Sequence, residues 1–195
     1  MRSRTAQIKR QTKETSIVAS VNLDGTGKVS ANTGISFLDH MIISFGKHSL
    51  IDLNVKAKSL DDIEHHLIED TAITLGSCID KALGNRSGIA RFGYASVPMD
   101  ESLSEVSIDL VKRQHGKLSL GMKRNQIENM SKEDIEHFFQ SLIQNLNSCI
   151  HVNVKYGEND HHRVESAIKS LAVAFRLASA LDKKQKGIPS TKGAM

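Results

Sequence analysis

The chain lacks tryptophan and has only two tyrosines and two cysteines among its 195 residues. Cys78 and Cys149 lie far apart without C-x-x-C spacing, so neither a zinc finger nor a disulfide framework is indicated. Free thiols fit a reducing cytosol, and we expect a cytoplasmic protein. The basic N-terminus has no following apolar block typical of a secretory signal. Because no apolar run is long enough to cross a bilayer, we expect no membrane partner.

Positive charge is modest, with a net charge of +4 and a pI near 9.1. Such a balance invites a nucleic-acid hypothesis. Aromatic residues are scarce, however, and the basic residues are scattered except at both ends. A positive site for a small phosphorylated molecule explains the charge equally well, and we expect no nucleic-acid partner. A hydrophobic content of 39% argues against disorder.

The motif His-His-x-x-Glu occurs twice, and a further histidine precedes each copy at nearly the same spacing. The set comprises six histidines and two glutamates: His40, His65, His66, Glu69, His137, His161, His162 and Glu165. This is enough for two metal ions with four protein ligands each. A single histidine near a helix start is usually a surface or capping residue. The matched duplication argues against that interpretation and favours metal binding.

Helix geometry constrains how these ligands are shared. Glu69 can lie on one helix face with either His65 or His66. Adjacent histidines project about 100° apart, so we expect each pair to serve two different ions. Two such pairs suggest two ions, each with ligands from both halves, whether of one subunit or of neighbours. Imidazole suits zinc, iron, nickel or copper, and manganese more often attracts carboxylates, so the donors do not identify the ion. Open positions beside four protein ligands would indicate catalysis.

Hydrophobic periodicity predicts an α+β protein with an internally duplicated β-β-β-α-β-α unit. We expect half-repeats at 1–90 and 91–182, followed by a basic irregular tail at 183–195. In the first half we expect strands over 5–11, 16–23 and 50–57, and helices over 36–46 and 61–83 with Asp61 or Asp62 as N-cap and Gly84 as C-cap. In the second half we expect strands over 91–97, 102–111, 117–122 and 150–156, a helix from the capping-box-like Ser131-x-x-Asp134 to Leu146, and a helix after Asn159 to Leu181.

Several blocks in the same order carry a family resemblance. They are 37–41 (Phe-Leu-Asp-His-Met), 64–70, 88–93, 97–101, 159–165 and 189–193 (Pro-Ser-Thr-Lys-Gly). From about Thr5 to the C-terminus the chain resembles the imidazoleglycerol-phosphate dehydratases of histidine biosynthesis. The resemblance implies two-layer halves, each a four-stranded sheet with two helices, of the ribosomal protein S5 domain 2-like type. It also implies 24 identical subunits built from trimers whose interfaces hold the sites.

The implied activity is loss of water from D-erythro-imidazole glycerol phosphate to give imidazole acetol phosphate, with two Mn2+ per active site. The carbon that loses its proton is not next to a carbonyl. An imidazolate held between two cations can instead push electrons through the ring and expel the neighbouring hydroxyl, with the metals as Lewis acids and template.

The resemblance also assigns residues. The implied catalytic residues are Glu14, His40, His66, Glu69, His162 and Glu165, with Glu14 as acid/base on a mobile segment. The implied substrate and phosphate contacts are Glu14, His48, Arg91, Arg113, Lys169, Ser190, Thr191 and Lys192, where the tail closes on the phosphate. Helical spacing places Lys169 one turn after Glu165, on the metal-facing side.

The chain departs from the family pattern at three places. Glu64 stands where Asp is usual, and Ser44 stands where Gln is common, so one phosphate contact is in doubt. The segment 111–114 differs from the usual Ser-Gly-Arg-Pro around Arg113.

Other functions fit less well. A ferritin-like di-iron site would need Glu-x-x-His on a helical bundle, and the metalloprotease motif H-E-x-x-H is absent. A nucleic-acid-binding protein with a structural metal gives no reason for eight duplicated ligands.

Overall fold

The computed structural model describes residues 3–193. The first half has four strands and two helices: β1 (Thr5–Gln11), β2 (Thr15–Asn22), β3 (Val29–Asn32), α1 (Ser36–Ser49), β4 (Asp52–Ser59) and α2 (Glu64–Leu83). The second half has β5 (Phe92–Met99), β6 (Ser102–Asp109), β7 (His115–Ser119), α3 (Lys132–Asn145), β10 (Cys149–Tyr156) and α4 (Asp160–Ser179). A small hairpin of β8 (Gln126–Ile127) and β9 (Met130–Ser131) precedes α3.

The two four-stranded sheets have the same topology, β1-β2-β4-β3 and β5-β6-β10-β7. Each sheet has one parallel pair, β3 with β4 in the first half and β7 with β10 in the second. The helix between the two strands of that pair, α1 or α3, makes the crossover, and the other pairs are antiparallel. The expected α+β fold with duplicated halves is therefore confirmed.

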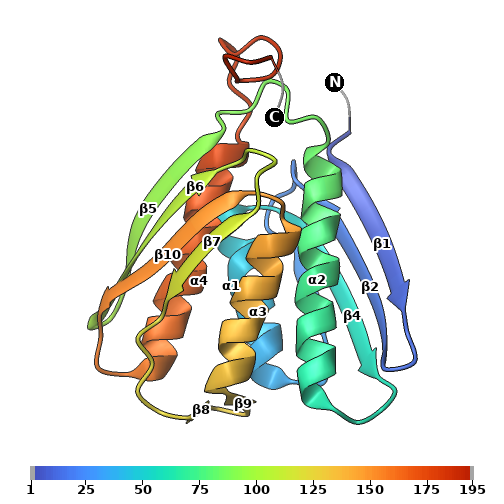
Figure 1. The fold of residues 1–195 in the computed structure, drawn as a ribbon, viewed down its shortest axis with the longest axis vertical. Coiled ribbons are helices and arrows are strands. Elements are labelled where there is room, and N and C mark those ends of the chain that lie inside the picture. The colour runs from blue at the N-terminus through green and yellow to red at the C-terminus, as the bar shows by residue number, and fades with distance from the viewer. Residues whose placement is uncertain (1–2, 194–195) are drawn as a thin grey trace.

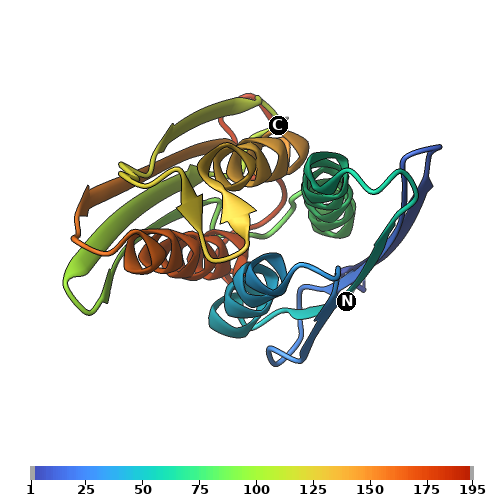
Figure 2. The same ribbon diagram turned by 90° about the horizontal axis from the view of Figure 1, so that it is seen from below.

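The helices lie between the sheets, so the molecule is layered as sheet, helices, sheet (Figures 1 and 2). Alternation along the strands produces this arrangement: in β2 the inward-facing Ile17, Ala19 and Val21 are buried, and the residues between them are partly exposed. In the middle layer α1 packs against α4, and α2 packs against α3. Each of these pairs joins a helix of the first half to a helix of the second.

Small residues allow the layers to approach closely. A Cβ atom on Gly93 in β5 would lie 2.0 Å from the carbonyl oxygen of Ala174 in α4. A Cβ on Gly76 in α2 would lie 2.7 Å from the carbonyl oxygen of Leu142 in α3. Neither site has room for a side chain.

Two predicted helix caps are confirmed, the N-cap of α2 is not, and α1 runs to Ser49 rather than ending near Gly46. Ser131 caps α3 by accepting from the N–H of Asp134, and Gly84 ends α2 by donating its N–H to Asp80, as predicted. The expected cap of α2 by Asp61 or Asp62 is wrong, because Ile63 occupies the N-cap position without a side-chain hydrogen bond. Asp61 instead accepts from Ile63 N–H at 3.0 Å and from the His66 ring.

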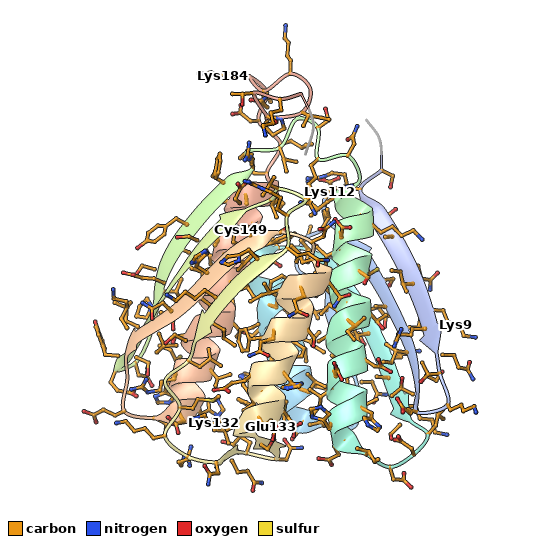
Figure 3. The ribbon with its side chains drawn as sticks, viewed as in Figure 1. Lys9, Lys112, Lys132, Glu133, Cys149 and Lys184 are labelled. Carbon is orange, nitrogen blue, oxygen red and sulfur yellow. The ribbon has the colours of Figure 1, made fainter. Side chains whose placement is uncertain are left out.

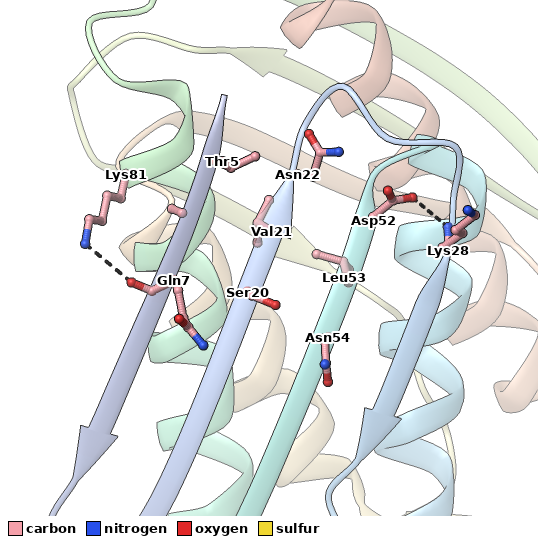
Figure 4. Close-up of a pocket in the computed structure, with 11 residues that line it drawn as sticks. Thr5, Gln7, Ser20, Val21, Asn22, Lys28, Asp52, Leu53, Asn54 and Lys81 are labelled. Carbon is pink, nitrogen blue, oxygen red and sulfur yellow. Dashed lines mark hydrogen bonds between the residues drawn. The ribbon is translucent and has the colours of Figure 1, made fainter. Parts of the chain in front are cut away.

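The outer face of the first sheet carries an open pocket of about 660 Å³ over β1, β2 and β4 (Figure 4). Asp52 accepts from Lys28 N–H there, and Lys81 donates to the carbonyl oxygen of Gln7. None of the predicted site residues lines it. Within residues 3–193 no helix has the length and apolar character to span a membrane.

Candidate metal centres and phosphate pocket

The structure gathers six of the eight ligand-type residues into two groups. The α1–α4 cluster consists of His40, His161 and Glu165; the α2–α3 cluster consists of His65, Glu69 and His137. In each cluster one donor atom per residue lies within 4.8 Å of the others. Each cluster combines residues of both halves, which is the distribution that the duplicated motif suggested.

Within each cluster the glutamate pairs with the first histidine of its motif. Nε2 of His161 lies 3.3 Å from Oε2 of Glu165, and Nε2 of His40 lies 3.5 Å from the same oxygen. In the α2–α3 cluster the ring centroids of His65 and His137 are 4.8 Å apart. Helix spacing left two partners open for each glutamate, and the structure selects the i, i+4 pair in both halves.

The second histidine of each motif faces a different group of carboxylates. His66 lies with Glu14 and Asp61, and His162 lies with Asp100 and Glu101. Glu14 precedes β2, and Asp100 and Glu101 join β5 to β6, so the turn between the first two strands supplies a carboxylate in both halves. Among the described residues, His66 and His162 therefore join neither metal-type cluster of their own chain.

Each of the four histidines in the two His-His pairs contacts a carboxylate through Nδ1. His65 donates to Asp134, His66 to Asp61 and His162 to Glu101, each at 2.7 Å, and His161 donates to Glu128 at 3.1 Å. Because an ionised carboxylate only accepts, Nδ1 carries a proton, and in the neutral ring the lone pair is on Nε2. Metal-ligating histidines characteristically have this arrangement.

Sequence reasoning missed these four carboxylates as site residues. Asp61 and Asp134 were interpreted only as helix caps, and Glu101 only as part of a family block. The four lie at no constant offset from the histidines they contact, so no spacing signal could have identified them.

Carboxylates in the clusters and beside their histidines have lowered pKa values. The hydrogen bond from His66 lowers the pKa of Asp61, and the backbone N–H of Asn159, with the His162 ring, holds the pKa of Glu101 far below its usual range. Burial acts to raise the pKa of Glu165, but the hydrogen bond and charge of Lys169 outweigh it and lower the pKa. These carboxylates are therefore ionised at neutral pH.

The same hydrogen bonds act on the histidines. Asp61 raises the pKa of His66, and Glu101 raises the pKa of His162. Lys169 Nζ lies 2.7 Å from Glu165 Oε1, which agrees with its predicted place on the metal-facing side of α4. His48, in the last turn of α1, has its pKa lowered by burial and then by the charge of Lys169.

Five of the predicted phosphate contacts form a separate pocket of about 350 Å³, lined by Arg91, Arg113, Ser190, Thr191 and Lys192 together with Val111 and Lys112. The guanidinium of Arg91 is partly occupied, since Nε and Nη2 donate to Asp109 at 2.7 and 3.0 Å and Nη1 donates to the carbonyl oxygen of Pro189 at 2.7 Å. Two of its five N–H groups remain for another acceptor.

The phosphate-type pocket and the metal-type clusters lie at opposite ends of the folded molecule. The backbone N–H of Arg91 donates to Ala178 at the end of α4, whereas His161 is at its start. At 1.5 Å of rise per residue, these points are roughly 25 Å apart along the helix. Figure 3 shows the same separation: Lys112 lies at one end of the molecule, and Lys132 and Glu133, at the start of α3, lie at the other. One chain alone does not bring the two sites together.

The comparisons with known proteins agree on one family. The family model described as imidazoleglycerol-phosphate dehydratase matches residues 33–175. A protein of that name from Desulforamulus reducens is 44% identical over 196 residues, covering 100% of both chains. One from Phytophthora nicotianae is 48% identical over 98% of this chain, which spans only 42% of that longer protein.

Two solved structures have the same fold. The crystal structure of imidazoleglycerol-phosphate dehydratase from Staphylococcus aureus has a TM-score of 0.82 and 26% identity, covering 91% of this chain and 99% of that one. The enzyme from Pyrococcus furiosus in complex with (S)-C348 has a TM-score of 0.82 and 32% identity, covering 96% of this chain and 100% of that one.

Proposed function

The chain belongs to the imidazoleglycerol-phosphate dehydratase family of hydro-lyases, and on that premise we propose that it removes water from D-erythro-imidazole glycerol phosphate. The product is imidazole acetol phosphate, an intermediate of histidine biosynthesis. The observation that carries the proposal is the pair of clusters, each with two imidazoles and one carboxylate within 4.8 Å.

The donor sets fit divalent metal ions. In each cluster one histidine has its Nδ1 held by a carboxylate, which leaves Nε2 for an ion. Mixed imidazole and carboxylate donors are compatible with manganese, and we propose two Mn2+ per active site. Bound ions of this kind supply Lewis-acid stabilisation of a deprotonated imidazole ring and a template for orienting it. The remaining steps belong to the side chains of the protein.

Glu14 is the proposed acid/base. It lies in the turn between β1 and β2, within the group formed with Asp61 and His66, and its carboxylate is exposed to solvent. A carboxylate at the edge of the metal-type region can take the carbon-bound proton once the substrate comes within hydrogen-bond reach. Lys169 is held beside the α1–α4 cluster by Glu165, where its charge can attract the substrate.

Substrate phosphate binds in the pocket of Arg91, Arg113 and the tail residues Ser190 to Lys192. The two free N–H groups of Arg91 and the flexible cations of Arg113 and Lys192 provide charge-assisted donors for its oxygens. We propose that the tail 183–195 closes on the phosphate there.

The active site is assembled from several copies of the chain. The substrate spans roughly 8 Å from ring to phosphorus at ~1.5 Å per bond, much less than the separation of about 25 Å between pocket and cluster along α4. Among the described residues, His66 and His162 join neither the α1–α4 nor the α2–α3 cluster of their own chain, so each is available to complete the coordination of a neighbour's ion. These features support sites at the interfaces between copies, and we propose that the copies form a 24-subunit assembly built from trimers.

Turnover of imidazole glycerol phosphate by Mn2+-loaded protein tests the proposal. We expect formation of imidazole acetol phosphate, loss of the activity after chelation and its return when Mn2+ is added back. Full turnover after exhaustive metal removal would exclude the metal-dependent mechanism, and no turnover by fully loaded, assembled protein would exclude the activity.

A further inference from the structure

We propose that Asp134 and Glu128, which lie outside both clusters, are positioning residues that each set the affinity of one metal ion. Asp134 acts through His65 on the α2–α3 cluster, and Glu128 acts through His161 on the α1–α4 cluster. This inference rests on the metal binding of the proposed function.

Asp134 is fixed from two sides. Its Oδ1 accepts from His65 Nδ1 at 2.7 Å, and its Oδ2 accepts from Ser131 Oγ at 2.6 Å. The Ser131 hydroxyl also accepts from the backbone N–H of Asp134 at 3.0 Å. The Asp134 side chain is only 16% exposed, so solvent screens its contact with His65 only partly.

The position of Asp134 connects the two helices that supply the α2–α3 cluster. It lies in the first turn of α3, three residues before His137 and on the same helix face. His65 lies at the start of α2. The hydrogen bond between Asp134 and His65 therefore holds the ligands of α2 and α3 at a fixed separation and fixes the proton of His65 on Nδ1.

Glu128 has the equivalent place at the other cluster. It lies in the tight turn between β8 and β9 with a positive φ of 50°, and its Oε1 lies 3.1 Å from His161 Nδ1. The next residue, Asn129, accepts from the backbone N–H of Phe37 at 3.2 Å and caps α1, the helix that carries His40. The N-cap position of α1 itself, Ile35, supplies no side-chain cap. The hairpin therefore contacts both ligand-bearing helices of the α1–α4 cluster.

The two carboxylates differ in how firmly they are held. Glu128 is 55% exposed and makes the longer contact, so its hydrogen bond is weaker than that of Asp134. Loss of such an outer carboxylate typically weakens metal binding by about 10–100-fold, because the imidazole loses both orientation and basicity. We expect Asp134→Ala to fall near the upper end of that range and Glu128→Ala near the lower end.

The experiment measures Mn2+ binding at fixed pH by the EPR signal of free Mn2+, using the assembled full-length protein. Wild type is expected to bind two ions per chain. In Asp134→Ala one dissociation constant should rise about 10–100-fold and the other should stay unchanged. Glu128→Ala should likewise affect one ion. The double variant should weaken both, because the two carboxylates act on different ions.

Two further variants separate positioning from folding. Ser131→Ala removes the cap of α3 and one of the two contacts that fix Asp134 but keeps the contact between Asp134 and His65, so it should lower the melting temperature while it weakens one ion less than Asp134→Ala does. Asp134→Asn keeps the shape and a neutral acceptor, so it should restore part of the affinity. It also keeps the test decisive if Asp134→Ala does not fold.

The outcomes distinguish this inference from the function on which it rests. If Asp134→Ala binds two ions with wild-type affinity, the inference is overturned and the proposed function is not. The same holds if a folded double variant of Asp134→Asn with Glu128→Ala binds two ions with wild-type affinity. A double variant that still binds one ion at wild-type affinity would overturn the assignment to separate ions. Failure of wild type to bind Mn2+ would overturn both the inference and the metal-dependent mechanism.

Discussion

Two inactive variants are expected to regain activity when they assemble together. One variant carries His161→Ala and lacks a donor of the α1–α4 cluster. The other carries Arg113→Ala with Lys192→Ala and lacks two cations of the phosphate pocket. Because the pocket and the cluster lie at opposite ends of each folded molecule, one active site must combine the cluster of one copy with the pocket of another. A mixed assembly then contains some sites in which both parts are intact.

The expected recovery follows from the geometry. Roughly 25 Å of α4 separates Arg91, which lines the pocket, from His161, and a substrate of roughly 8 Å cannot bridge that distance. In a random equal mixture, about half of the sites receive an intact cluster and about half receive an intact pocket. Both parts are therefore intact at about a quarter of the sites. Turnover should therefore return to about a quarter of the wild-type rate. A site contained within one chain would give no recovery.

The assay uses co-expression of the two variants with different affinity tags, purification over both tags and measurement of turnover. A matched control pairs His161→Ala with His40→Ala. Both changes damage the α1–α4 cluster, so no mixture restores an intact cluster and activity should stay absent. Verified mixed assemblies without activity, or a control pair that recovers equally well, would refute the reasoning.

Three more outcomes are expected. Glu14→Gln should keep the Mn2+ content of wild type but lower turnover by about 10²–10⁴-fold; an unchanged rate would remove Glu14 from the mechanism. Gly93→Ala should lower the free energy of unfolding by at least about 1–3 kcal/mol, because the new Cβ would lie 2.0 Å from the carbonyl oxygen of Ala174; denaturant unfolding measures it, and an unchanged midpoint would contradict the packing. Asp52 accepts the N–H groups of Thr26 and Lys28, and the Thr26 bond is the main cause of its lowered pKa. Its ionised form therefore stabilises the folded chain above the unfolded value of 3.8, and this contribution is lost as pH falls through the lower folded pKa. The stability difference between wild type and Asp52→Asn should thus be largest near neutral pH and shrink in acid; a constant difference would contradict it.

The duplicated fold could be predicted because its causes are local. Apolar residues alternate along Thr15–Asn22 and recur with helical spacing along α2 and α4, and both patterns are written in consecutive residues. Ser131 and Asn159 cap helices through side chains that contact N–H groups two or three residues away. Such contacts depend on chain geometry within one turn. The four-residue strand β3 and the hairpin at 126–131 were not located, since segments this short carry almost no periodic pattern.

The site could be predicted only in its parts. The repeated motif and the histidine that precedes each copy identified the eight ligand-type residues, and the 100° step between neighbours predicted that each His-His pair faces two directions. Long-range packing decided the rest: α1 meets α4 and α2 meets α3, so Glu69 joins His65 and not His66. The N-cap predicted at Asp61 is wrong, because Ile63 takes the N-cap position of α2 and Asp61 contacts the Ile63 N–H and the His66 ring instead.

The sequence by itself therefore determined which side chains are available, since helix and strand periodicity fix the face on which each one lies. Only the tertiary structure decided which of them meet. It brought Asp134 and Glu128 to the imidazoles of other elements, and it placed the pocket of Arg91 and Lys192 at the far end of α4 from the clusters. Contacts between distant segments depend on how whole layers pack, and no spacing within a single segment encodes that packing.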